Sequence, residues 1–299
     1  MKIEITHCTL CPRKCGADRT SRTGFCGGGN GIRAARAALH HWEEPCISGT
    51  NGSGTVFFTG CHLRCCFCQN LPISLENTGA DISPERLAEI FLELQEQNAH
   101  NINLVTASHL LPWIIRALEI AKPELHIPVV WNCGGYELEE SVAALDGLVD
   151  IFLPDFKFFD PETARSYANA PDYPQVAERA VAQMLRQTGK PVMEGGLLRQ
   201  GCIIRHLVLP NHRHESIALL RHLAERFGTE QFLLSLMAQY TPMQEFPEHP
   251  ELNRRITKME YNSVLKTAQE LGFQGYLQDK SAAQSTYTPD FGLEGIQKD

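Results

Sequence analysis

The sequence predicts an α/β protein, a partial (β/α)6 parallel barrel preceded by a small N-terminal cysteine-rich module. Six short apolar runs, typical of buried strands, alternate with amphipathic helical stretches. The runs cover residues 54–59, 102–106, 128–132, 150–153, 202–209 and 232–237. Short links between strands and helices predict parallel strands joined by right-handed crossovers. A closed barrel of this kind has eight units, so the six units found here favour a partial barrel.

The helix after the first strand has the clearest start signal. Ser83 is a suitable N-cap, Pro84 occupies the first turn and Glu85 follows it, a combination typical of helix starts. Apolar residues then recur at helical spacing, and they are Leu87, Ile90, Phe91 and Leu94. Further amphipathic stretches cover residues 110–121, 137–145, 173–186, 215–227 and 257–271.

The chain is expected to have three parts. Residues 1–50 lack sustained periodicity and contain the first cysteine group, so they are predicted to form the accessory module. Residues 51–275 contain the strand and helix units of the barrel core. Residues 276–299, in which Ser, Gln, Thr and Pro are interspersed, are predicted to form an irregular C-terminal tail.

Composition narrows the class of protein. The formal net charge is -8, so the basic surface of nucleic-acid-binding proteins is not expected. No apolar stretch approaches the length that crosses a bilayer, and the N-terminus lacks the apolar core of a signal peptide. We therefore expect a cytoplasmic protein with neither nucleic acid nor membrane as a partner.

The 11 cysteines indicate metal ligation, because the cytosol keeps thiols reduced. Eight of them form two dense groups. In one group, Cys61, Cys65 and Cys68 follow the first apolar run at C-x3-C-x2-C spacing. Three thiolates on one loop can ligate three irons of a cubane cluster and leave the fourth open. Metal sites that do chemistry keep such an open position.

The alternatives for this group are a zinc knuckle and a buried thiol cluster. Zinc loops usually pair cysteines two by two, and no partner pair follows within the next sixty residues. The additional thiol, Cys66, interrupts the spacing of the triad. We expect Cys66 to point away from the metal and to pack as a small apolar side chain.

The other group contains four cysteines, Cys8, Cys11, Cys15 and Cys26. Four thiolates can close a tetrahedral zinc site or ligate every corner of an iron–sulfur cluster. The spacing does not separate the two metals, and four crowded metal-free thiols are the third alternative. A closed site of this kind is structural or relays electrons.

The triad, with Phe67 before its last cysteine, resembles the signature of the radical S-adenosylmethionine (SAM) superfamily. This resemblance implies a [4Fe-4S] cluster at Cys61, Cys65 and Cys68 whose open iron binds SAM. It further implies reductive cleavage of SAM to methionine and a 5′-deoxyadenosyl radical, which abstracts a hydrogen atom from a substrate. The implied fold is a partial barrel of radical SAM type.

Further stretches resemble the branch related to pyruvate formate-lyase activating enzyme, and they cover residues 68–70, 103–106, 132–136, 153–157, 205–211 and 237–240. The resemblance runs from about residue 7 to 290. It implies an electron donor such as flavodoxin or ferredoxin and a glycyl radical enzyme as substrate, although another peptide or a small molecule fits equally well. The opposing hypothesis is a non-catalytic iron–sulfur or zinc protein for electron transfer or regulation, which leaves the barrel without a role.

Four residues are predicted to bind the cofactor. Asp155 and Lys157 end the fourth strand on one face of the sheet, and the resemblance places such a pair beside SAM and a monovalent cation. Arg205 lies within the apolar fifth strand and needs a partner there, either the SAM carboxylate or a barrel acid. Asn132 ends the third strand before two glycines, where it meets ribose or methionine, or caps a turn.

The residues after the second strand depart from the superfamily pattern. Many members have a Gly-Gly-Glu stretch there for the SAM amino group, but this chain has Val-Thr-Ala-Ser-His at 105–109. Thr106 and Ser108 can accept hydrogen bonds from an ammonium without supplying charge. His206 is expected to be a packing residue, and the sequence singles out no catalytic acid or base.

Overall fold

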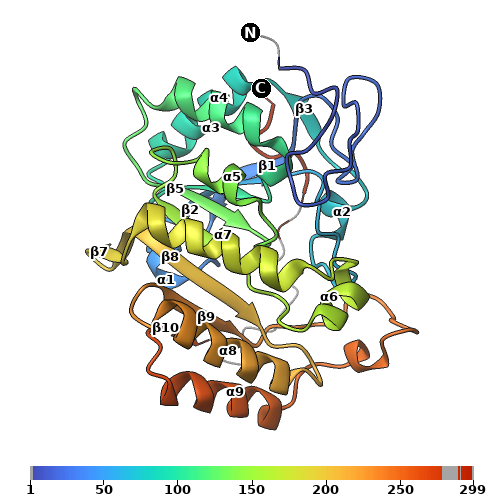
Figure 1. The fold of residues 1–299 in the computed structure, drawn as a ribbon. Coiled ribbons are helices and arrows are strands. Elements are labelled where there is room, and N and C mark those ends of the chain that lie inside the picture. Colours follow the sequence, from blue (N-terminus) through green and yellow to red (C-terminus); the bar gives the residue numbers. More distant parts are fainter. Residues whose placement is uncertain (1–2, 278–288, 290, 298–299) are drawn as a thin grey trace.

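The structure is a computed structural model that describes residues 3–277, 289 and 291–297, and its centre is a curved sheet surrounded by helices (Figure 1). The strand order is β10-β9-β8-β6-β5-β4-β2-β1-β3. The strands from β2 to β10 in this order are parallel. They are β2 (Ser53–Phe58), β4 (Ile102–Val105), β5 (Val129–Cys133), β6 (Ile151–Pro154), β8 (Leu197–Leu207), β9 (Leu233–Met237) and β10 (Gly275–Leu277). The six predicted strands and the parallel α/β fold are thus confirmed.

Three strands that the sequence analysis did not predict pair antiparallel with their neighbours. β1 (Ile32–His40) pairs with β2, and β3 (Ala80–Ile82) pairs with β1. β7 (Val192–Glu194) forms a hairpin with β8. β1 belongs to the segment expected to form the accessory module, and through its pairing with β2 it extends the sheet of the barrel.

The longer helices cover the outer face of the sheet, and all but the one at Pro161–Ala168 lie where the amphipathic stretches predict. The longer ones are α3 (Pro84–Glu96), α4 (Leu111–Ala121), α6 (Pro161–Ala168), α7 (Tyr173–Thr188), α8 (Arg213–Phe227) and α9 (Lys258–Glu270). The short ones are α1 (Pro45–Ser48), α2 (Leu71–Ser74), α5 (Glu139–Ala143), η1 (Ser108–Leu110) and η2 (Pro250–Asn253). At the start of α3 the Arg86 N–H donates to Ser83 Oγ, as the capping signal predicts.

The short helix α1 packs on the inner face of the sheet. Cys46 and Ile47 form an apolar cluster with inward side chains of β5, β6 and β8, among them Val130, Ile151 and Ile203. The Asn101 side chain donates to Ile47 O at 2.8 Å and ties α1 to the start of β4. Because α1 fills the interior near the N-terminal ends of the strands, the polar cavity of the barrel interior lies toward their C-terminal ends.

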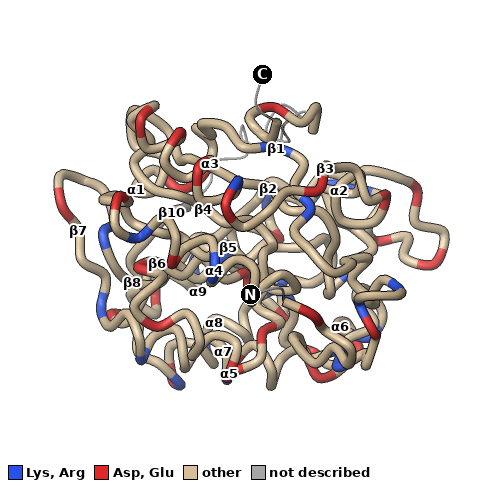
Figure 2. Tube along the Cα trace, turned by 90° about the horizontal axis from the view of Figure 1, so that it is seen from above, with Lys and Arg blue, Asp and Glu red and all other residues tan. Residues whose placement is uncertain are grey.

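The predicted C-terminal tail lies mostly outside the described residues. Its first two residues, Tyr276 and Leu277, are not irregular but belong to β10 and pair with β9. Residues 291–297 run beside β1, where Leu293 N–H donates to Ala35 O and Ala37 N–H donates to Glu294 O. Lysines and arginines are interspersed with acidic residues around the molecule (Figure 2). Within the described ranges, no helix has both the length and the apolar character needed to cross a membrane.

Candidate active site

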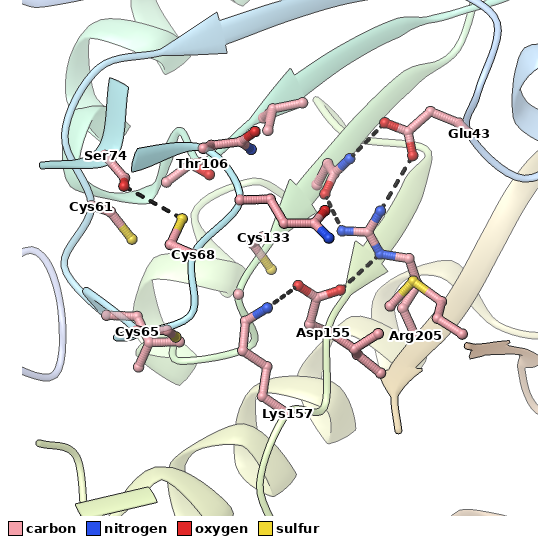
Figure 3. A pocket seen from close by; sticks show the side chains of 18 of the residues that line it. Glu43, Cys61, Cys65, Cys68, Ser74, Thr106, Cys133, Asp155, Lys157 and Arg205 are labelled. Atoms are coloured by element: carbon pink, nitrogen blue, oxygen red, sulfur yellow. Dashed lines mark hydrogen bonds and ion pairs between the residues drawn. The ribbon is translucent and has the colours of Figure 1, made fainter. Parts of the chain in front are cut away.

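A cavity of about 310 Å³ opens inside the sheet, near the C-terminal ends of the parallel strands. Because side chains alternate along a strand, one inward residue from each of several strands reaches it. Its lining includes the three cysteines predicted to ligate the cluster and the four residues predicted to bind the cofactor. They are Cys61, Cys65, Cys68, Asn132, Asp155, Lys157 and Arg205. Figure 3 shows the three cysteines on one side of the cavity and Arg205 on the other.

The cysteine loop begins directly after β2 with a tight backbone turn at Gly60. Gly60 has φ of +92°, and a Cβ there would lie 2.6 Å from Cys26 O, so glycine fits both the conformation and the close approach. The next residue, Cys61, donates its N–H to the same carbonyl at 3.0 Å. Further along, Cys68 N–H donates to Cys65 O, and Ser74 Oγ donates to Cys68 Sγ.

Arg13, which the sequence analysis did not single out, fastens this loop to the end of α6. Its guanidinium donates to the carbonyls of His62 and Leu63 in the loop, and to those of Ala168 and Asn169 after α6. The guanidinium carbon also lies 4.6 Å from the centre of the Phe25 ring. One side chain therefore holds together three segments that are far apart in the sequence.

We expect Arg13→Ala to lower the free energy of unfolding by about 2–4 kcal/mol, because charged hydrogen bonds to several carbonyls are lost together. Urea denaturation of the metal-free protein measures this change. Arg22, an exposed arginine of the same segment, is the control, and Arg22→Ala should change stability by less than about 0.5 kcal/mol. Equal effects of both substitutions would contradict the role of Arg13.

The three predicted ligands are suited to an iron–sulfur cluster. Burial raises the pKa of the Cys61 and Cys65 thiols, and Lys157 nearby opposes this shift in both. No three His, Cys, Asp or Glu side chains among the described residues surround a single point as ligands of one metal ion. Three thiols of one loop that face a common cavity are compatible with a cluster, because each of its irons takes one cysteine.

Cys66 faces a different environment from that of the triad. It does not line the cavity, and its N–H donates to Tyr167 O. Burial raises the pKa of its thiol to about 11, and Glu251 beside it adds to the shift. This placement agrees with the expectation that Cys66 points away from the metal.

A charged network connects the predicted cofactor residues. Asp155 accepts from Lys157 Nζ at 2.5 Å and from Arg205 Nε at 2.8 Å. Arg205 Nη2 donates to Asn132 Oδ1 at 2.7 Å, and Nη1 donates to Glu43 at 3.2 Å. Burial alone would raise the pKa of Asp155, but Arg205 and Lys157 beside it lower that pKa below its usual value.

Arg205 therefore finds its partners among barrel acids and Asn132, one of the two alternatives that the sequence left open. Its Nε, Nη1 and Nη2 each donate to a protein group. Lys157 uses one ammonium N–H for Asp155, and an ammonium has three. A direct contact between Arg205 and SAM stays a prediction, and Lys157 has more donor capacity for a ligand.

Two site residues that sequence reasoning missed, Glu43 and Glu44, come from the segment between β1 and α1. Both line the cavity. Glu43 accepts from Asn103 and Asn132 at 3.2 Å each, as well as from Arg205. The sequence signal was a pair of adjacent acids directly before Pro45, the first residue of a helix. Such pairs are usually solvated, so only the fold shows their burial.

The secondary predictions divide between the cavity and its surroundings. Thr106 lines the cavity, whereas Ser108 does not and donates to Glu137 instead. His206 is buried and lies within hydrogen-bond distance of Phe156 O and Ser216 Oγ. These contacts identify His206 as a packing residue, as the sequence predicts.

The four N-terminal cysteines gather beside the cysteine loop. Cys8, Cys11 and Cys26 are buried, while Cys15 is exposed. A Cβ placed on Gly24 would lie 3.5 Å from the sulfurs of both Cys15 and Cys26, so these two thiols face the same small space. The hydrogen bond from Cys61 to Cys26 makes the two cysteine groups immediate neighbours.

Comparison with known proteins agrees with this site. The model of the family described as "Radical SAM superfamily" matches residues 55–224, more than half of the chain. Uncharacterized protein MJ0674 of Methanocaldococcus jannaschii is 29% identical over 285 residues, which cover 90% of this chain and 78% of that protein.

The crystal structure of methylornithine synthase (PylB) is 14% identical, with a TM-score of 0.45. The superposition covers 72% of this chain and 63% of that one, so the chain spans less than two thirds of its length. The family match carries the assignment, since its range contains most of β2, the cysteine loop and the strands from β4 to β8. The chain belongs to the radical SAM superfamily.

Proposed function

We propose that Cys61, Cys65 and Cys68 hold the [4Fe-4S] cluster that membership of this superfamily implies, and that the chain cleaves SAM reductively. When bound, the cluster would supply the electron for reductive cleavage of SAM to methionine and a 5′-deoxyadenosyl radical, which would abstract a hydrogen atom from the substrate. The main support is that the three thiols share one cavity with Asp155 and Lys157, which follow β6, and with Arg205 on β8.

The residues around the cysteines suit the polar groups of SAM. Lys157 is close enough to Cys65 to affect the pKa of its thiol, and its remaining N–H groups can donate to the SAM carboxylate. Asp155 favours the charged form of Lys157, because it raises the pKa of that amine against the effect of burial. Arg205 and Asn132 hold Asp155 and Glu43 in position. Direct contacts of Arg205 and Asn132 with SAM are also part of the proposal.

For the substrate, the resemblance to the pyruvate formate-lyase activating enzyme branch supports a glycyl radical enzyme, with flavodoxin or ferredoxin as electron donor. The decisive experiment is electron paramagnetic resonance of the reduced, reconstituted protein. We expect its spectrum to change when SAM is added, and 5′-deoxyadenosine to form. If the cluster is intact and reduced but its spectrum does not change when SAM is added, the result would support the non-catalytic alternative instead.

The N-terminal cysteines are proposed to hold a second, closed metal site. Changing Cys8, Cys11, Cys15 and Cys26 together to serine should lower the bound metal but leave SAM cleavage by dithionite measurable, because the triad lies on a separate loop. Elemental analysis and chromatography of 5′-deoxyadenosine measure the two effects. The serine variant keeps the Cys26 carbonyl that accepts from Cys61. Unchanged metal content in this variant would disprove the second site.

A further inference from the structure

Glu44 is a buried carboxylate with an unused oxygen. The residue is 8% exposed and lines the cavity. Its Oε2 is covered from solvent and has no hydrogen-bond donor among the described residues. Neighbouring Glu43, in contrast, accepts from three donors. A buried acceptor without a partner is costly, so Glu44 Oε2 needs a donor from beyond the described residues, which a ligand of the cavity can supply.

The location of Glu44 separates it from the cysteine loop. Glu44 is the N-cap of α1, and its electrostatic neighbours are Arg205 on β8 and Ser235 on β9. The cysteine loop follows β2, and β4, β5, β6 and β8 lie between β2 and β9 in the sheet. Glu44 is therefore on the other side of the cavity from the proposed position of the SAM methionine group.

The charges of the cavity indicate what kind of group this is. Three buried or nearly buried carboxylates, Glu43, Glu44 and Asp155, surround Arg205 and Lys157. When all three are ionised, these carboxylates outnumber the two buried cations by one, and the further cation of the lining, Arg64, is exposed. Burial, together with repulsion from Glu43, raises the pKa of Glu44, and a cation bound beside it would offset the cost of ionisation.

Trp42 adds a second feature that attracts cations. It lines the same cavity and is 59% exposed. Aromatic rings attract cations through their faces. A positively charged nitrogen that enters past Trp42 would meet the free oxygen of Glu44 further inside.

We propose that Glu44 binds a cationic nitrogen group of the substrate, an alkylammonium or a guanidinium. This inference rests on the proposed function and specifies the substrate class of the same cavity. The group belongs either to a free amine or to a lysine or arginine side chain, since both present the same chemistry.

The test uses the cluster-loaded protein with saturating SAM, without reductant, and two probes of similar shape. We expect pentylammonium to bind at least about tenfold more tightly than 1-pentanol, as measured by ligand-observed NMR, because a hydrogen bond between charged groups is worth that much. Glu44→Gln should reduce the preference to less than about threefold. The peptide Gly-Gly-Lys-Gly-Gly is the third probe and distinguishes the two sources. Binding as tight as that of pentylammonium indicates a lysine or arginine side chain, and weaker binding indicates a free amine.

Glu137→Gln is the matched control. Glu137 is a carboxylate of similar burial, 3% exposed, that accepts from Ser108 and does not line the cavity. The control should keep the preference for the ammonium. Absence of any preference in the wild-type protein would overturn the proposal, whether or not the variants fold.

A loss of SAM affinity in Glu44→Gln without an effect on the amine would also overturn the proposal, since it would assign Glu44 to SAM. SAM cleavage without any added substrate is measured on the same wild-type sample. If the protein does not cleave SAM, the proposed function is contradicted. If it cleaves SAM but shows no preference for the ammonium, only the role of Glu44 is contradicted.

Discussion

Changing Cys61, Cys65 or Cys68 to alanine is expected to abolish the [4Fe-4S] cluster and SAM cleavage together, while Cys66→Ala retains most of the activity. Each triad cysteine is proposed to ligate a different iron, so the loss of one leaves the cluster with two protein ligands instead of three. Iron and sulfide analysis after anaerobic reconstitution measures the cluster. Chromatography of 5′-deoxyadenosine after reduction measures cleavage.

Cys66→Ala is the matched control because it changes the same kind of side chain in the same loop. The position of Cys66 depends on a backbone hydrogen bond to Tyr167, which alanine keeps. The thiol itself is near Glu251 rather than in the cavity. If Cys66→Ala lost the cluster while Cys65→Ala kept it, the proposed ligand set would be wrong.

The sequence was sufficient to predict six of the seven parallel strands, all but β10, and the gathering of the site. Apolar runs and helical spacing identify each βα unit, and α3 begins where its capping residues predict. Parallel strands end at one edge of the sheet, so residues as distant as Cys61 and Arg205 could be expected to meet there. The cavity confirms that they do.

The segments outside the repeating pattern could not be placed in this way. β1 pairs antiparallel with β2, and the following segment turns into the barrel interior, where Glu43 reaches Arg205 across 162 positions of sequence. Arg13 reaches Ala168 across 155 positions. Contacts of such separation depend on the path of the whole chain. From the neighbouring sequence alone, Glu43 and Arg13 are expected to be ordinary charged residues of the surface.

Asp155→Asn is expected to weaken SAM binding by about thirtyfold or more, because losing one partner of a buried charged hydrogen bond costs about 2–5 kcal/mol. The amide keeps the shape of the side chain but leaves Arg205 and Lys157 without a shared counter-charge. We therefore also expect the free energy of unfolding to fall by about 3–5 kcal/mol. Cluster content should stay unchanged, since Asp155 is not a proposed ligand.

The control for this substitution is Glu194→Gln, which breaks the exposed ion pair between Glu194 and Arg199 on the β7–β8 hairpin. An exposed pair contributes less than about 1 kcal/mol, so neither SAM affinity nor stability should change appreciably. Calorimetric titration of SAM and urea denaturation separate the two roles of Asp155. A variant that is less stable but binds SAM within threefold of the wild type would assign Asp155 to the barrel alone.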